Sequence, residues 1–220
     1  MKPRISDCEP RKYNLQVMNT AGANAERGLG VGDEYRAQIS DADVSVLRSM
    51  IGNRFYTVYA PCLQVAGAHL TAPSFSIPVF DKITGNWSHR YVVIRCEWSE
   101  TPVALSDYWQ MYVSCESDPH GIEVNSTGAI VAPCTIKYFQ ATPISKIEIY
   151  EFRWSAGLKN GQETVVYDQA IRFEQENGKA FCIACQLDGP GVATEVHISE
   201  DEETIRQFLE GAHLRMRVEV

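Results

Sequence analysis

Two alternating strands that meet at Glu176-Asn177-Gly178-Lys179 constrain the fold of this chain more than any other feature. They occupy the segment Val165–Leu187. An Asn-Gly pair between two alternating apolar runs is the strongest short-range signal for a β-hairpin. The segment therefore predicts two antiparallel strands joined by a tight turn, and it carries no catalytic motif.

The apolar pattern decides how the two strands of this hairpin pair. A two-residue Asn-Gly turn would place Phe181 and Ile183 on the same face as the charged residues of the first strand. A three-residue loop with Gly178 in the left-handed conformation pairs Phe173 with Phe181 and Ile171 with Ile183 instead. One face is then wholly apolar, and a slip of one residue would undo this arrangement. The sequence therefore predicts the three-residue loop with a bulge.

A first helix is predicted over residues 40–51. Ser40 and Asp43 resemble a capping box, in which two side chains satisfy free backbone groups at the helix start. An apolar stripe follows them. Gly52 stands where a left-handed residue commonly ends a helix.

A second helix is predicted over residues 200–210. Ser199 and Glu202 have the spacing of a full capping box, and Gly211 follows the apolar stripe. After this helix, residues 214–220 alternate between apolar and charged side chains, which is typical of a half-buried strand.

Strands dominate the rest of the chain, so we expect an α+β fold with mainly antiparallel sheets and two short helices. Residues 1–12 are polar and are expected to form a loose N-terminal arm. Residues 13–220 are expected to form a single compact domain, which could comprise two related halves at 13–125 and 126–220. The main strand candidates are Arg54–Ala60, Tyr91–Trp98, Trp109–Cys115, Thr135–Gln140 and Lys146–Arg153.

Two pairs of similar sequence segments suggest an internal pseudo-twofold repeat. The pattern from Ser40 to Gly52 recurs 159 residues later, from Ser199 to Gly211. Separately, Ile94–Glu97 resembles Ile171–Glu174 within the predicted hairpins. Convergent use of common cap and strand residues would give the same pattern, so both interpretations stay open.

Charge and composition exclude several classes of function. The net charge of −8 argues against a protein that binds the phosphate backbone of nucleic acids. No apolar run approaches the length of a membrane span, and no secretory signal is evident. The seven scattered cysteines are then expected to be reduced thiols of a cytoplasmic protein.

The only C-x-x-C pair, Cys182 and Cys185, lies within a predicted strand. Residues three apart on a strand point to opposite faces, which argues against a redox pair or a shared metal ion. The sequence favours two buried or half-buried thiols that serve in packing. The five histidines do not occur at metal-ligand spacing. We therefore expect no cofactor and no metal.

Aromatic and polar residues gather around one predicted strand and the turn after it. The candidate binding residues are Tyr108, Trp109, Asp118 and His120. Aromatic side chains beside polar groups suit a recognition patch. Trp109 would equally suit a core, and the turn residues are ordinary ones.

The favoured function is a non-catalytic, protein-binding module, similar in style to an immunity protein or antitoxin that neutralises its partner through an acidic face. One alternative is a hydrolase or transferase with its site between two pseudo-symmetric halves. Another is an assembly protein whose edge strands, such as residues 214–220, pair between subunits. The sequence leaves the oligomeric state open.

Overall fold

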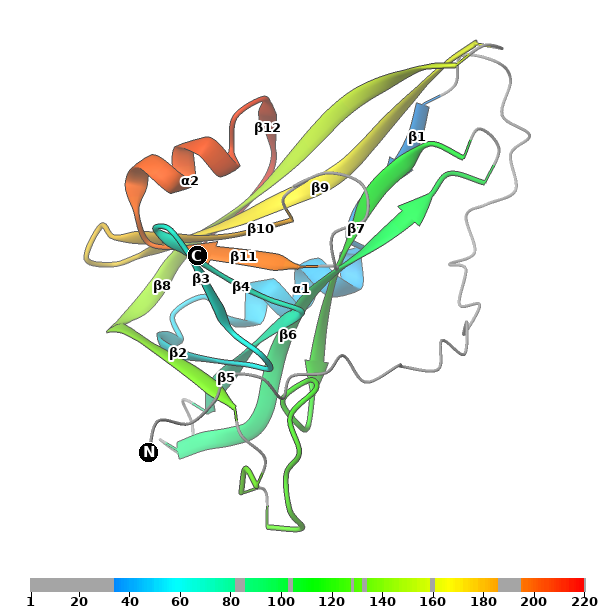
Figure 1. Ribbon diagram of the computed structural model, residues 1–220. Helices are drawn as coiled ribbons and strands as arrows, with labels where there is room; N and C mark the ends of the chain where they lie inside the picture. The colour runs from blue at the N-terminus through cyan, green and yellow to red at the C-terminus, as the bar shows by residue number, and fades with distance from the viewer. Residues whose placement is uncertain are drawn as a thin grey trace.

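The computed structural model describes residues 34–81, 86–102, 105–127, 129–131, 134–158, 161–185 and 195–219. Within these residues, twelve strands form two antiparallel sheets that share one long strand, and two short helices accompany them (Figure 1). The predicted strand-dominated α+β fold is confirmed. The predicted N-terminal arm, residues 1–12, lies outside the described residues.

The first sheet has the strand order β3-β4-β11-β10-β9-β8. In addition, β1 pairs with β9 in parallel, and β12 pairs with β8 in antiparallel. The strands of this sheet are β1 Glu34–Ala37, β3 Gln64–Ala66, β4 His69–Ala72, β8 Thr135–Leu158, β9 Gly161–Gln175, β10 Ala180–Cys185, β11 Val196–Ser199 and β12 Ala212–Glu219.

The second sheet continues from β8 in the order β8-β2-β5-β6-β7. Its other strands are β2 Arg54–Ala60, β5 Ser74–Asp81, β6 Asn86–Glu100 and β7 Asp107–Glu116. The strands predicted around β2, β6 and β7 are therefore present. The two strands predicted at Thr135–Gln140 and Lys146–Arg153 are parts of the single long strand β8, which pairs with β2 through its first half and with β9 and β12 through its second.

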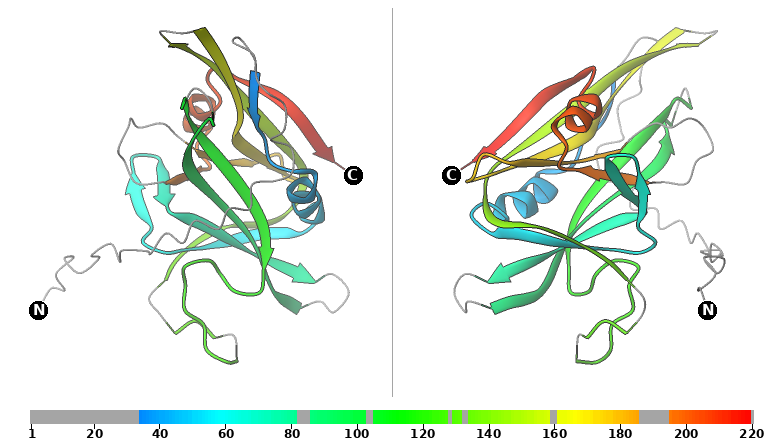
Figure 2. Two further views of the ribbon diagram at one scale, coloured as in Figure 1. Left: turned by 90° about the vertical axis from the view of Figure 1, so that its right-hand side faces the viewer. Right: turned by 60° about the vertical axis from the view of Figure 1, so that its left-hand side comes forward.

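The strands curl so that the edge strand β7 returns towards β1 and β9 (Figure 2). Side chains of the β6–β7 hairpin form hydrogen bonds with side chains of β1 and β9. The hydroxyl groups of Tyr35 and Tyr108 lie 3.3 Å apart, and Thr101 Oγ1 donates to Glu163 Oε2 at 2.6 Å. The main apolar core fills the space enclosed by the curled sheets.

A disulfide between Cys96 on β6 and Cys185 on β10 joins the two sheets across this core. The expectation that all cysteines are reduced thiols is therefore wrong. Both half-cystines are buried and stand on core-facing positions of strands that are far apart in sequence. That proximity arises from the curl of the sheet, which spacing along the chain does not reveal.

The β9–β10 hairpin has the predicted register. Phe173 pairs with Phe181 and Ile171 with Ile183, and Gly178 has a φ of 79°. The backbone N–H of Gln175 donates to the Lys179 carbonyl at 2.8 Å, which closes a three-residue loop. The apolar pattern correctly selected this loop over a two-residue turn.

The first helix, α1, runs over Asp41–Ser49 and begins as predicted. Ser40 Oγ accepts a hydrogen bond from the Asp43 backbone N–H, and Asp43 accepts one from Ser40 N–H. Gly52 has a φ of 73°, a left-handed conformation that glycine adopts without a steric penalty. The capping box and the glycine stop are both confirmed.

The second helix, α2, runs over Glu202–Phe208 and begins differently from the prediction. Its cap is Asp201, whose carboxylate accepts the Thr204 backbone N–H at 2.9 Å. Ser199 is the last residue of β11 and donates its hydroxyl to the Ala68 carbonyl, so it cannot cap the helix. Neither helix in the described part of the chain has the length and apolar composition of a membrane span.

The predicted internal repeat is not shown by the structure. The two hairpins do share a register, because Ile94 pairs with Val113 as Ile171 pairs with Ile183. The strands that follow the two helices differ, however: β2 lies between β8 and β5, whereas β12 pairs with β8 alone among the described strands. The different caps, Ser40 and Asp201, also break the correspondence of the helices.

Candidate functional site

A groove of about 990 Å³ lies on the outer face of the first sheet, between α2 and the β9–β10 hairpin. Lys179 and Ala180 line it from the hairpin, and Ile205 and Leu209 line it from the helix. Arg172 on β9 also lines it. The groove therefore combines apolar side chains from the hairpin and the helix with the guanidinium group of Arg172 from the sheet.

The register of four neighbouring strands places Arg172 within a row of facing residues. Arg217 on β12 pairs with Glu148 on β8, Glu148 pairs with Arg172, and Arg172 pairs with Cys182 on β10. Successive residues of a strand alternate between faces, so this row lies on the outer face, opposite the core position of Ile171. Oppositely charged residues thus face each other directly across the strands.

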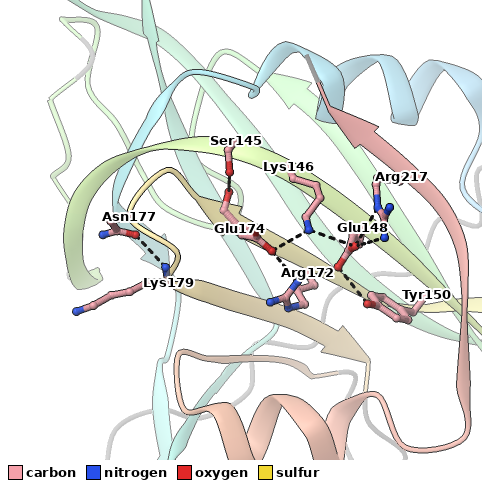
Figure 3. Close-up of polar contacts among 9 residues, drawn as sticks. All are labelled: Ser145, Lys146, Glu148, Tyr150, Arg172, Glu174, Asn177, Lys179 and Arg217. Carbon is pink, nitrogen blue, oxygen red and sulfur yellow. Dashed lines mark hydrogen bonds and ion pairs between the residues drawn. The ribbon is translucent and has the colours of Figure 1, made fainter.

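Glu148 is the centre of a dense polar network (Figure 3). Its Oε2 accepts hydrogen bonds from Arg172 Nη1 at 2.8 Å and from the Tyr150 hydroxyl at 3.1 Å. Its Oε1 accepts two from Arg217, at 3.0 Å from Nη2 and 3.1 Å from Nε. The side chain is only 6 % exposed, so these partners replace the water that a carboxylate would otherwise bind.

Lys146 and Glu174 extend the network towards the tip of the hairpin. Lys146 Nζ lies 2.9 Å from Glu174 Oε2 and 3.6 Å from Glu148 Oε1. Arg172 Nη1 also contacts Glu174 Oε2, at 3.1 Å (Figure 3). Three cations therefore surround two carboxylates. Lys146 and Arg172 each contact both carboxylates, whereas Arg217 contacts Glu148.

These contacts control the ionisation of both carboxylates. Burial pushes the pKa of Glu148 upward, but the hydrogen bonds from Arg172 and Arg217 outweigh burial and hold the pKa below its ordinary value. The hydrogen bond from Lys146 lowers the pKa of Glu174 in the same direction. Both groups are therefore ionised at neutral pH, and the network is rigid and charged.

A small apolar cluster forms where α2 packs on the sheet. The buried members of this cluster are Ala170, Cys182, Ala184, Ile205 and Phe208. Burial raises the pKa of the Cys182 thiol to about 12, although the charge of Arg172 acts in the opposite direction. Cys182 is thus a neutral packing residue, as the sequence predicted, and it anchors the helix that forms one wall of the groove.

The helix side of the groove is rich in acidic residues. Glu200, Glu202, Glu203 and Glu210 all line it. Arg206 also lines it and forms an ion pair with Glu203. On the opposite side, Lys179 projects from the hairpin loop (Figure 3). The two walls therefore differ in charge.

The four residues predicted to form a binding patch lie in two separate places. Tyr108 and Trp109 stand at the start of β7, and each is 5 % exposed. Asp118 and His120 are exposed in the turn beyond the other end of that strand, where His120 Nδ1 lies 3.6 Å from Glu116. A strand of ten residues is roughly 33 Å long, so the structure does not bring the two pairs together.

Sequence reasoning missed the groove. By themselves, Arg172 and Glu174 are typical of the solvated face of a strand, because their partners Glu148 and Lys146 belong to a distant strand. The alternation of charged residues on both sides of the hairpin did place Arg172 and Glu174 on one face, which is the signal that could have found the site. The packing of α2 over that face had no visible signal in the sequence.

Among the residues that the structure describes, no group of three or more histidine, cysteine, aspartate or glutamate side chains is arranged to hold a metal ion. No protein-family model matches the sequence, and neither a curated protein nor a solved structure matches the chain.

Proposed function

We propose that this protein is a binding module that holds a basic segment of a partner protein in the groove between α2 and the β9–β10 hairpin. The observation that carries the proposal is the composition of this groove. It joins an apolar wall to an acidic rim over a rigid ionic network. Apolar contact area supplies most of the affinity in such a site, and charge supplies orientation.

The rigidity of the groove favours binding because little freedom is lost when a partner docks. Arg172 and Lys146 are each held by two carboxylates, and α2 is anchored by Phe208. A site that is already ordered avoids much of the entropic cost of association. The hairpin wall is also fixed, since its loop is closed by the bond between Gln175 and Lys179.

The charge of the molecule indicates the kind of partner. The net charge is −8, and Glu202, Glu203 and Glu210 line the helix side of the groove. The acidic residues on the helix side, together with the net negative charge of the molecule, attract basic segments over a distance and raise their association rate. This proposal keeps the acidic binding surface expected from the sequence and assigns it to α2.

Selection of peptides from a random display library against the intact protein tests the proposal. We expect selected peptides to combine lysine or arginine with apolar residues and to lose binding to a Glu210→Lys variant. The matched control is Glu123→Lys, which makes the same change of charge at an exposed site outside the groove. Peptides without basic residues, or peptides that bind both variants equally, would overturn the proposal.

A further inference from the structure

The tip of the β6–β7 hairpin exposes two large apolar side chains that the proposed groove does not use. Trp98 is 50 % exposed and Leu105 is 64 % exposed. The tip lies beside β1, on the opposite side of the molecule from α2 (Figure 1). Tryptophan is enriched at protein interfaces, so an exposed tryptophan and an exposed leucine on one hairpin tip indicate a candidate contact surface.

Two carboxylates share the face of the hairpin that carries Trp98. The register pairs Trp98 with Trp109 and Glu100 with Asp107. Residues two apart on a strand point to the same side, so Trp98, Glu100 and Asp107 form one surface. We call this surface, together with Leu105, the tip patch.

Glu100 and Asp107 stand directly opposite each other, and like charges in this position destabilise a sheet. Both side chains are exposed, and neither forms an ion pair with any residue in the described part of the chain. The neighbouring pair on the other face is different, because Glu97 forms an ion pair with Arg95. The hairpin therefore neutralises one face and leaves the tip patch with two uncompensated negative charges.

Leu105 is exposed to solvent and has a strained backbone conformation. Leu105 has a φ of 55°, which is sterically unfavourable for a residue with a side chain. The buried Thr101 holds Ser106, the residue that follows Leu105. Its backbone N–H donates to the Ser106 carbonyl at 2.9 Å, and its hydroxyl accepts the Ser106 N–H at 3.0 Å and donates to Glu163 at 2.6 Å.

Two buried polar atoms at the base of the tip have no hydrogen-bond partner among the residues that the structure describes. They are Ser106 Oγ and Trp109 Nε1, and both residues are at least nine-tenths buried. Strain, like-charge repulsion and unsatisfied polar atoms thus coincide in one short segment. Such costs accumulate at functional sites, where they are retained for a purpose other than stability.

We propose that the tip patch is a second docking surface, which takes an arginine side chain from a basic segment of a partner protein. A guanidinium group stacks on the exposed ring of Trp98 and donates hydrogen bonds to Glu100 and Asp107 at the same time. The charge of the arginine removes the repulsion between the two carboxylates. Leu105 contacts an apolar residue that neighbours the arginine.

Two short peptides test this proposal by nuclear magnetic resonance of the intact ¹⁵N-labelled protein. One is acetyl-Ala-Leu-Arg-Leu-Ala-amide, and the other has citrulline, which is uncharged and similar in shape, in place of arginine. We expect the arginine peptide to shift the Trp98 indole and Asp107 amide signals, with at least a fivefold higher affinity than the citrulline peptide. Equal shifts with both peptides, or no shifts up to about 10 mM, would overturn the proposal.

Variants separate this surface from the proposed groove. Glu100→Gln combined with Asp107→Asn should weaken arginine binding at least fivefold and raise the melting temperature by about 1–3 °C, because the repulsion is removed. Glu97→Gln is the control on the opposite face and should leave the affinity unchanged. Binding at the tip patch is read from the Trp98 indole signal, which separates it from any binding of the same peptide in the groove. Loss of the Trp98 shift in Glu97→Gln, or its retention in the double variant, would contradict the assignment.

Discussion

Phe173 and Phe181 face each other across β9 and β10 with their ring centroids 4.6 Å apart and their planes within 5° of parallel. Phe55 stacks on the other side of Phe181 at 4.1 Å, which connects this pair to β2. The three rings lie in the core that the two sheets enclose. The hairpin register therefore determines which face of the sheet is core and which face carries the groove.

Replacing Gly178 with alanine should lower the free energy of unfolding by about 1–2 kcal/mol, because a side chain is strained in the left-handed conformation. An added Cβ would meet no atom within 4 Å, so the loss is conformational and not steric. Gly178→Asn is the matched comparison, since asparagine tolerates this conformation better. Urea denaturation measures both, and equal losses would argue against the three-residue loop.

Replacing Glu148 with glutamine should destabilise the protein by about 3 kcal/mol, because Arg172 and Arg217 then lose their shared carboxylate. Glu151→Gln on the same strand is a milder comparison, since Glu151 accepts a hydrogen bond from the neutral Gln38 and lies 4.0 Å from Arg36. Chemical denaturation at neutral pH measures the difference. Similar stabilities for the two variants would show that the network contributes little.

Stability should fall as the solution is acidified below about pH 4.5. The folded state holds the pKa of Glu148 and Glu174 below their ordinary value of 4.5, so the unfolded chain binds protons more readily. The stabilisation is thus fully present above that pH and is lost as the pH falls through the lowered pKa values. Thermal melts of wild type and Glu148→Gln between pH 3 and 7, at roughly half-unit steps, check this, and the variant should show the weaker dependence.

Reduction of the disulfide between Cys96 and Cys185 should lower the free energy of unfolding by about 2–4 kcal/mol, because the bond closes a long loop in the unfolded chain. The two cysteines are 89 residues apart. A Cys96→Ala variant should behave like the reduced protein. Cys182→Ala, which removes a free buried thiol, is the control and should leave the effect of the reductant unchanged. If the reductant still destabilised Cys96→Ala, its effect would not come from the disulfide between Cys96 and Cys185.

Local chemistry was sufficient to predict part of this fold. The alternation around Gly178 gave the correct register, and the Ser40–Asp43 box gave the start of α1, because each depends on residues close in sequence. The prediction that Ser199 caps the second helix was wrong. Ser199 has the right spacing, but β11 recruits it into the sheet, and Asp201 then takes the capping role.

Long-range relationships could not be predicted in the same way. Glu148 meets Arg172 and Arg217 only because β8 lies between β9 and β12. The burial of Tyr108 likewise depends on the curl that brings β7 to β1. Trp109 was a candidate binding residue from the sequence, but it is buried, whereas its cross-strand neighbour Trp98 is exposed.

The most direct test of the proposed function is a calorimetric titration of a library-selected basic peptide into the wild-type protein and the two charge variants. Glu210→Lys should weaken binding at least tenfold, whereas Glu123→Lys should change it less than about twofold at physiological salt, where charges more than about 8 Å away are screened. Equal affinities for the two variants would show that the groove between α2 and the β9–β10 hairpin is not the binding site.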